Sequence, residues 1–139
     1  MGRLIKLESA GKQRAQLVRL LAQATQAIAQ TTIGEVERLD LLAFIILTLE
    51  AIQATIEPSV QAWEKRGYWV KADQFRQEWM WTGRFSAEMR EAVSARDWSG
   101  ALQTVSKIQA KLAPLKLPER QRMQKPWTGA WKRFDNRAV

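Results

Sequence analysis

The most apolar stretch of the chain covers residues 39–56 and reads LDLLAFIILTLEAIQATI. Between residues 41 and 49, the only polar side chain is that of Thr48. Further along, polar residues recur at helical spacing on one side, at Glu50, Gln53 and Glu57. This pattern predicts a helix that is buried on almost all sides in its first half and exposes one narrow face in its second half. We expect the other segments of the chain to pack around it.

A transmembrane helix is the competing interpretation of this stretch, but charged residues interrupt it too early. A membrane span needs about 20 consecutive apolar residues, and here Asp40 and Glu50 bracket the apolar run. Pro58 lacks a backbone N–H, so it is predicted to end this helix and to stand in the first turn of the next one. We therefore predict a central core helix and no membrane contact.

Residues 10–31 are predicted to form an amphipathic helix that precedes the central one. Its apolar residues recur at alternating steps of four and three, at Leu17, Leu21, Ala24 and Ile28. Ser9 stands where a side-chain oxygen can cap the start of this helix. Gly34 provides the turn into the central helix, either just after the first helix or within a capping box over residues 32–35.

Three acidic residues, Glu35, Glu37 and Asp40, open the central helix. The helix macrodipole stabilises negative charge at this end. Three carboxylates could instead ligate a divalent cation, but the chain contains no His and shows no matched carboxylate pair on a second helix. We favour the macrodipole interpretation and expect neither a metal site nor a cofactor.

The next predicted helix spans residues 58–81. Its core face is formed by Tyr68, Ala72, Phe75 and Trp79, with Trp63 and Val70 at the flank. Trp69 lies off this face, and its helical neighbours are Asp73 and the cations Lys65, Arg66 and Arg76. An exposed indole among cations can stack on a nucleic-acid base while the cations hold phosphates. The alternative is that Trp69 packs beneath another helix and the cations reach past it to solvent.

Two shorter helical segments follow a predicted break at Gly83. Residues 86–95 continue an apolar line at steps of four, formed by Phe85, Met89 and Val93. Residues 98–113 follow Asp97 as N-cap and end at Pro114, with apolar side chains at Trp98, Leu102, Val105, Ile108 and Leu112. Together, the segments predict an all-α, single-domain bundle of about four main helices over residues 10–113, preceded by an arm of residues 1–9.

Residues 114–139 are predicted to form a basic tail that Pro114, Pro118 and Pro126 divide into short pieces. Pro126 can open a last helical turn in which Trp127, Trp131 and Phe134 share one face. Because this face is too apolar to leave in water, we expect it to dock on the bundle while the cations of the tail point outward. The tail cations singled out as binding candidates are Arg120, Arg122, Lys125, Lys132, Arg133 and Arg137.

Charge is distributed unevenly along the chain, whose formal net charge is +8. Residues 1–14 carry four basic and one acidic side chain, and residues 114–139 carry seven basic and two acidic ones. Residues 32–57, in contrast, carry five acidic side chains and one basic side chain. This asymmetry fits basic ends that bind an anionic partner, and it also fits basic ends that fold onto the acidic helix of the same molecule.

The residue types present restrict the chemistry that the chain can perform. It contains no Cys and no His, and it shows no P-loop, dinucleotide-binding or nucleophile-elbow motif. We therefore expect a protein that is not an enzyme. The amino-terminal segment has too short an apolar run for a signal peptide, so we expect a cytoplasmic location.

Two classes of function fit these patterns. The first is nucleic-acid binding or association with a ribonucleoprotein, indicated by a pI of about 10.3 and by tryptophans next to Lys and Arg. The second is a protein adaptor or assembly subunit, in which Trp and Arg anchor an interface with an acidic protein partner. We prefer the first because the excess charge is concentrated at both ends, and the pattern leaves open whether the chain forms a homo-oligomer. The predicted binding residues are Lys65, Arg66, Trp69, Arg76, Arg120, Arg122, Lys125, Lys132, Arg133 and Arg137.

Overall fold

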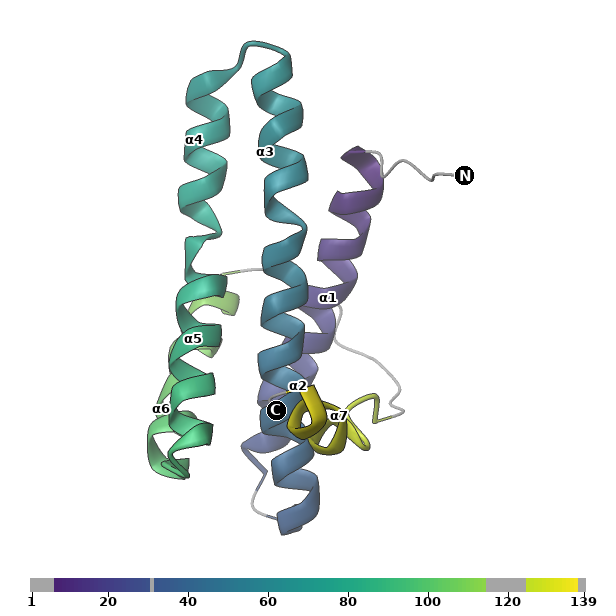
Figure 1. Ribbon diagram of the computed structural model, residues 1–139, viewed down its shortest axis with the longest axis vertical. Helices are drawn as coiled ribbons and strands as arrows, with labels where there is room; N and C mark the ends of the chain where they lie inside the picture. Colours follow the sequence, from purple (N-terminus) through teal and green to yellow (C-terminus); the bar gives the residue numbers. More distant parts are fainter. Residues whose placement is uncertain (1–6, 31, 115–124, 138–139) are drawn as a thin grey trace.

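The computed structural model describes residues 7–30, 32–114 and 125–137, and in these ranges the chain forms seven α-helices and no strand (Figure 1). They are α1 (Leu7–Ile28), α2 (Glu35–Ala54), α3 (Ile56–Lys65), α4 (Trp69–Glu78), α5 (Met80–Ser94), α6 (Trp98–Leu112) and α7 (Ala130–Arg137). The predicted all-α, single-domain fold is confirmed.

Several of these helices continue one another. The combined helix of α2 and α3 spans 31 residues, Glu35–Lys65, and Thr55 marks the local interruption between them. In the same way, α4 and α5 follow each other across Trp79. The described ranges therefore contain four long rods, formed by α1, by α2 with α3, by α4 with α5 and by α6, together with the short helix α7 (Figure 1).

The helix at the centre of the fold is α2, as predicted. It packs against α1, α5 and α7, and its core side chains Leu41, Ile45, Leu49 and Ile52 have no solvent exposure. The combined helix of α2 and α3 is long and apolar enough to cross a membrane, but 67% of its most apolar window is buried inside the molecule. Neighbouring helices cover these side chains, as expected for a core helix.

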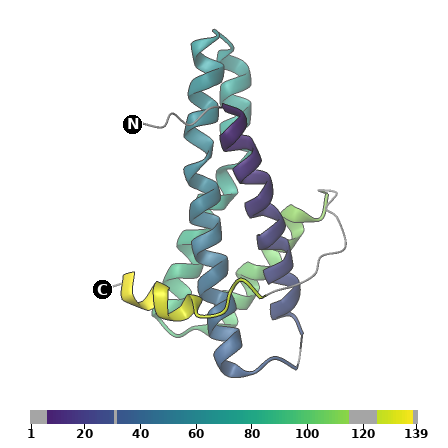
Figure 2. The same cartoon turned by 90° about the vertical axis from the view of Figure 1, so that its right-hand side faces the viewer.

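The buried apolar side chains form two clusters. The larger cluster surrounds α2 and contains side chains from α1, α5, α6 and α7. The smaller cluster lies between α3 and α4 and consists of Ile56, Val60 and Ala72. Half-buried Trp79 packs against both clusters. The α3–α4 hairpin therefore has a small core of its own, and it projects beyond the rest of the bundle (Figures 1 and 2).

Pro58 explains the interruption between α2 and α3. It has no N–H to donate to the carbonyl of Ala54, four residues earlier, and its ring crowds that carbonyl. At the junction, the backbone N–H and the hydroxyl of Thr55 both donate to the carbonyl of Ile52, at 2.9 and 2.7 Å. Pro58 lies in the first turn of α3 as predicted, although the rod continues in nearly the same direction (Figure 1).

The prediction of one helix over residues 58–81 is wrong, because the chain reverses at Gly67. This glycine has a φ of +82°, in the left-handed region that favours glycine at the end of a helix. Its N–H donates to the carbonyl of Glu64 at 2.9 Å, and the N–H of Tyr68 donates to that of Trp63 at 3.0 Å. These bonds close the end of α3, so α3 and α4 form an antiparallel hairpin.

Two other local predictions are also wrong, and one is confirmed. Gly83 does not break a helix but lies within α5, where a methyl group in its place would come within 2.7 Å of Nε2 of Gln53. Ser9 lies inside α1, which begins at Leu7, and so does not cap it. Asp97 caps α6 as predicted, because its Oδ1 accepts the N–H of Gly100 at 2.9 Å.

The tail returns to the bundle as α7, which lies across α2 (Figure 2). Trp127 and Phe134 are buried, and the Trp127 ring meets Phe44 of α2 edge to face at 6.2 Å between centroids. Trp131 is half-buried and packs against the margin of the larger cluster. The predicted docking of the tail aromatics is therefore confirmed.

Candidate functional site

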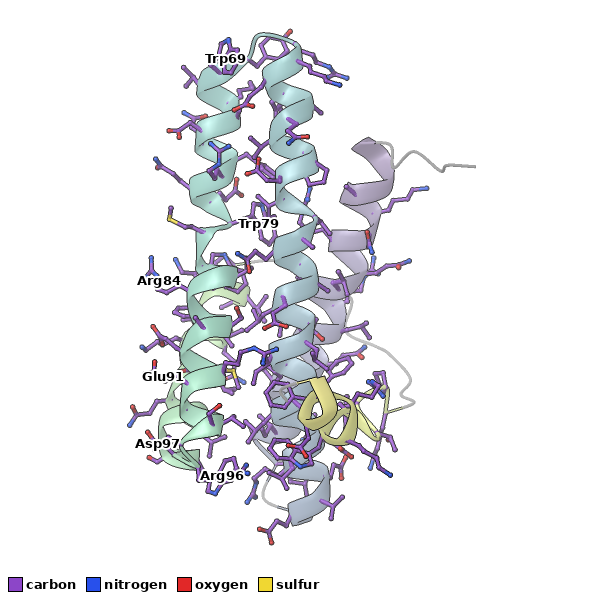
Figure 3. The ribbon with its side chains drawn as sticks, in the orientation of Figure 1. Trp69, Trp79, Arg84, Glu91, Arg96 and Asp97 are labelled. Atoms are coloured by element: carbon purple, nitrogen blue, oxygen red, sulfur yellow. The ribbon has the colours of Figure 1, made fainter. Side chains whose placement is uncertain are left out.

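The largest group of exposed apolar side chains in the described residues lies at the turn between α3 and α4. We call residues 65–71 the hairpin tip. Within it, Tyr68 is 50% exposed, Trp69 is 63% exposed and Val70 is 70% exposed. Figure 3 shows Trp69 at the far end of the hairpin, away from the main bundle. Three adjacent apolar side chains at the end of a projecting hairpin are typical of a contact surface.

Trp63, just below the tip, holds part of the tip in a defined conformation. The rings of Trp63 and Tyr68 meet edge to face with centroids 5.9 Å apart. Nζ of Lys71 lies 5.4 Å from the centroid of the Trp63 ring, within the range of a cation–π interaction. In the part of the chain that the structure describes, no aromatic ring or cation stacks on the indole of Trp69 in this way. The Trp69 ring is therefore available to a partner.

Charge along the hairpin is separated between the tip and the shaft, which we define as residues 56–64 and 72–78. The tip carries the cations Lys65, Arg66 and Lys71 and no acidic residue, and all three cations are exposed. The shaft carries one cation, Arg76, and four acidic residues, Glu57, Glu64, Asp73 and Glu78. The excess of positive charge is therefore confined to the tip, and acidic residues border it at Glu64, next to Lys65, and at Asp73, four positions after Trp69 in α4.

Arg76 does not belong to the cationic surface that the sequence predicted around Trp69. Its Nε lies 3.4 Å from a carboxylate oxygen of Glu57, and its Nη2 lies 3.8 Å from one of Glu64. These contacts tie α4 to α3 in the shaft. The prediction placed Lys65, Arg66, Trp69 and Arg76 on one face of a continuous helix. The reversal at Gly67 instead leaves Lys65 and Arg66 before the turn, while Trp69 and Arg76 both lie in α4, seven positions apart, with Arg76 paired to α3.

The predicted tail cations form no common surface with the hairpin tip, because α7 lies near the opposite end of the molecule (Figure 1). Lys132 and Arg133 are exposed, as predicted. Lys125 is exposed too, with 62% of its side chain accessible, and it also places Nζ 3.3 Å from a carboxylate oxygen of Glu37. Arg120 and Arg122 lie outside the described residues, as does the side chain of Arg137.

The acidic start of α2 binds the tail. Asp40 is buried, and its two carboxylate oxygens accept the backbone N–H groups of Gly129 and Trp131, each at 3.0 Å. The indole N–H of Trp127 donates to Oε2 of Glu37, also at 3.0 Å. Negative charge thus stands at the amino end of α7, where the helix dipole favours it. The ion pair between Lys125 and Glu37 is a case of the second interpretation of the charge asymmetry, in which a basic end folds onto the acidic helix of the same molecule.

The hydrogen bond from Trp127 holds the pKa of the Glu37 carboxyl below its usual range, against an opposing effect of desolvation. Lys125 adds to the lowering through its own hydrogen bond and its charge. The macrodipole of α2 was the sequence-based explanation for these carboxylates. The charge asymmetry allowed a basic end to fold onto these carboxylates, but no local pattern indicated which groups, about ninety residues further along the chain, they bind.

A further Trp–Arg contact, not predicted from the sequence, joins the α5–α6 turn to α7. Arg96 has a φ of 60°, which is unusual for a residue with a side chain. Its guanidinium carbon lies 5.9 Å from the ring centroid of Trp98 and 5.6 Å from that of Trp131. Figure 3 shows Arg96 at the opposite end of the molecule from Trp69. We assign this contact to the docking of α7.

Comparison with models of protein families, with curated proteins and with solved structures gives no match to this chain, so no relative supplies a function for it.

Proposed function

We propose that this protein binds nucleic acid through the hairpin tip and performs no catalysis. The observation that carries the proposal is the 63% exposed indole of Trp69 within a tip that has three exposed cations and no acidic residue. Base stacking on an aromatic side chain contributes about 1–3 kcal/mol per base. Lys and Arg beside it supply the phosphate contacts that position the strand.

The position of the tip supports the proposal as well. The hairpin projects from the bundle, so a long polymer can reach the tip without meeting the other helices (Figure 2). The exposed cations of α7, Lys132 and Arg133, lie too far away to share a short contact with it (Figure 1). We assign them a general electrostatic attraction for a polyanion, which raises the rate of encounter.

The test compares two triple variants that change net charge equally. One replaces the tip cations (Lys65→Gln, Arg66→Gln and Lys71→Gln). The control replaces three exposed cations elsewhere (Lys12→Gln, Arg84→Gln and Lys111→Gln). Each variant removes three positive charges from the net +8. Binding of fluorescein-labelled single-stranded and duplex oligonucleotides is followed by anisotropy over a range of salt concentrations.

We expect the tip variant to lose affinity and to reduce the slope of log affinity against log salt by about 2–3 units, close to one for each phosphate contact. The control variant should keep most of the slope, because its charges act only at long range. Equal slopes for the two variants would show that net charge alone attracts the oligonucleotide, and the tip would then have no role in binding it.

A protein adaptor is the second candidate, and Val70 is the observation that favours it. Val70 is 70% exposed, a fraction similar to that of Trp69, yet its aliphatic side chain offers no ring on which a base can stack. A protein partner would bury all three apolar side chains of the tip. Val70→Ser separates the two candidates, because it should leave oligonucleotide affinity unchanged and weaken the capture of a protein partner.

A further inference from the structure

We infer that the hairpin tip binds unpaired nucleotides, about two or three at a time, and discriminates against duplex. This inference rests on the proposed function, since it concerns which form of nucleic acid the tip accepts. It follows from three features, namely the exposed ring of Trp69, the width of the hairpin and the change from basic residues in the tip to mostly acidic residues in the shaft.

The first feature is the availability of the Trp69 ring. Stacking requires a base with a free face, and in a continuous duplex each base is covered by its neighbours in the stack. Single strands offer such faces at every nucleotide. Tyr68, next to Trp69, is 50% exposed and already held by its contact with Trp63 at 5.9 Å. It can contact a second nucleotide at little further cost in side-chain ordering.

The second feature is the width of the hairpin. Each helix with its side chains is about 10–12 Å across, so two helices side by side form a structure roughly 20 Å wide. The major groove of duplex DNA is about 12 Å wide and admits one helix. The α3–α4 hairpin therefore cannot enter the groove with its two helices side by side across it, and in that orientation the tip reaches only the outer phosphates of a duplex.

The third feature is the short extent of positive charge. The tip offers three cations, and the shaft below it carries four acidic residues against one basic residue. A stiff duplex laid across the tip would extend its phosphates past these cations, where the one cation of the shaft, Arg76, is already paired with Glu57 and Glu64. A flexible strand can place about two or three phosphates on the tip and then turn away from the acidic shaft.

The experiment measures competition. Fluorescein-labelled oligothymidylate is bound to the full-length protein, and unlabelled circular DNA is added either as a single strand or as a relaxed duplex of the same sequence. Closed circles avoid duplex ends, whose terminal bases have a free face. The protein is used as wild type, as Trp69→Ala, as Trp69→Phe and as Trp98→Ala, which removes a partly exposed indole at the other end of the molecule.

We expect the single-stranded circle to compete better per nucleotide than the duplex circle. Trp69→Ala should weaken single-strand binding by about 5- to 150-fold, the loss expected for one stacked base, and should leave duplex competition nearly unchanged. Trp69→Phe should restore part of the loss because it keeps an aromatic ring, and Trp98→Ala should have no effect. The unfolding temperature of Trp69→Ala should match that of the wild type, since the side chain lies mostly in water.

Three other results would overturn the inference. Equal or better competition by the duplex circle, with Trp69→Ala without effect, would leave the proposed function standing and assign the tip to phosphate contacts alone. Single-strand preference that survives Trp69→Ala would place the discrimination outside the tip. Failure of oligothymidylate and of both circles to bind the wild-type protein would overturn the proposed function together with the inference, and would direct attention to a protein partner or an anionic membrane surface.

Discussion

Arg14 is a half-buried cation that donates its hydrogen bonds to uncharged groups. Its Nη1 lies 3.1 Å from both the carbonyl and the hydroxyl oxygen of Thr55 and 3.3 Å from the hydroxyl of Ser59. The guanidinium also covers the rings of Phe75 and Trp79, at 4.8 and 5.5 Å from their centroids. Burial lowers its pKa, an effect that the charge of Glu78 partly offsets. Arg14 thereby joins α1 to the two residues at which the long rods are interrupted, Thr55 between α2 and α3 and Trp79 between α4 and α5.

We expect Arg14→Met to destabilise the protein by about 1.5–3 kcal/mol, the usual contribution of a hydrogen bond from a charged group. Urea unfolding followed by circular dichroism measures the change. Lys12→Met is the matched control, because Lys12 is exposed on the same helix and should change stability by less than about 0.5 kcal/mol. Arg14→Lys should fall between them, since it keeps the charge but loses the planar group. Equal stability of the two Met variants would contradict this role.

At the scale of the element, α7 depends on the bundle for its existence. It has only 8 residues, and isolated helices shorter than about 12–15 residues are marginal in water. Docking on α2 supplies the stability that so short a helix lacks. Asp40 accepts two N–H groups at the start of α7, and the larger cluster buries Trp127 and Phe134. Any change that weakens the contacts with α2 should therefore unfold α7 before the rest of the molecule.

Acidification is one such change, because the pKa of Glu37 is lowered in the folded protein. A lowered carboxyl pKa means that the stabilising contribution is complete above the ordinary Glu pKa of about 4.3 and is lost as pH falls through the folded value. We therefore expect the hydrogen-exchange protection of the Trp127 indole N–H to decrease as pH falls below about 4.3. Glu37→Gln should remove much of this dependence, whereas Glu35→Gln, at an exposed neighbour, should retain it. Loss of protection at the same pH in both variants would assign the effect to other carboxylates.

At the scale of the whole molecule, most of the buried core surrounds α2, and the exposed apolar side chains of the hairpin tip lie at a distance from it. The larger cluster holds most of the buried apolar side chains, while the projecting hairpin has the small cluster of Ile56, Val60 and Ala72. A binding surface at the hairpin tip can therefore be exposed without opening the main core. The same separation allows tip variants to be tested in a folded protein.

Two substitutions within α2 test this arrangement. Leu49 has no solvent exposure, and Leu49→Ala should destabilise the protein by about 2–5 kcal/mol because it removes buried methyl groups and leaves a cavity. Val36, at the start of the same helix, is 75% exposed, and Val36→Ala should change stability by less than about 0.5 kcal/mol. Urea unfolding compares the two. Similar losses would mean that the amino end of α2 is covered in solution, for example by a second copy of the chain.

Part of the candidate site could be predicted from residue spacing alone. Trp69 was placed off the core face, because helical periodicity reports which side of a segment is apolar. Lys65 and Arg66 were placed beside it through a continuous helix that does not form, and they share the tip with Trp69 because they flank the turn at Gly67. Tyr68 and Val70 were misplaced because the periodicity was carried through Gly67. A glycine within an apolar pattern can lie in a helix, as Gly83 does, or end one, as Gly67 does, and spacing alone does not separate these cases.

The sequence by itself determined the all-α fold, the burial of α2, the Asp97 cap and the docking of the tail aromatics, because each follows from the order of residues within one segment. Only the tertiary structure decided which distant groups meet. Arg14 contacts Thr55 across 41 positions, and Asp40 receives the N–H groups of Gly129 and Trp131 across 89 and 91 positions. Periodicity encodes the apolar face of a helix but carries no information about which charged or polar group of a distant segment that helix will meet, so these contacts depend on how the helices pack.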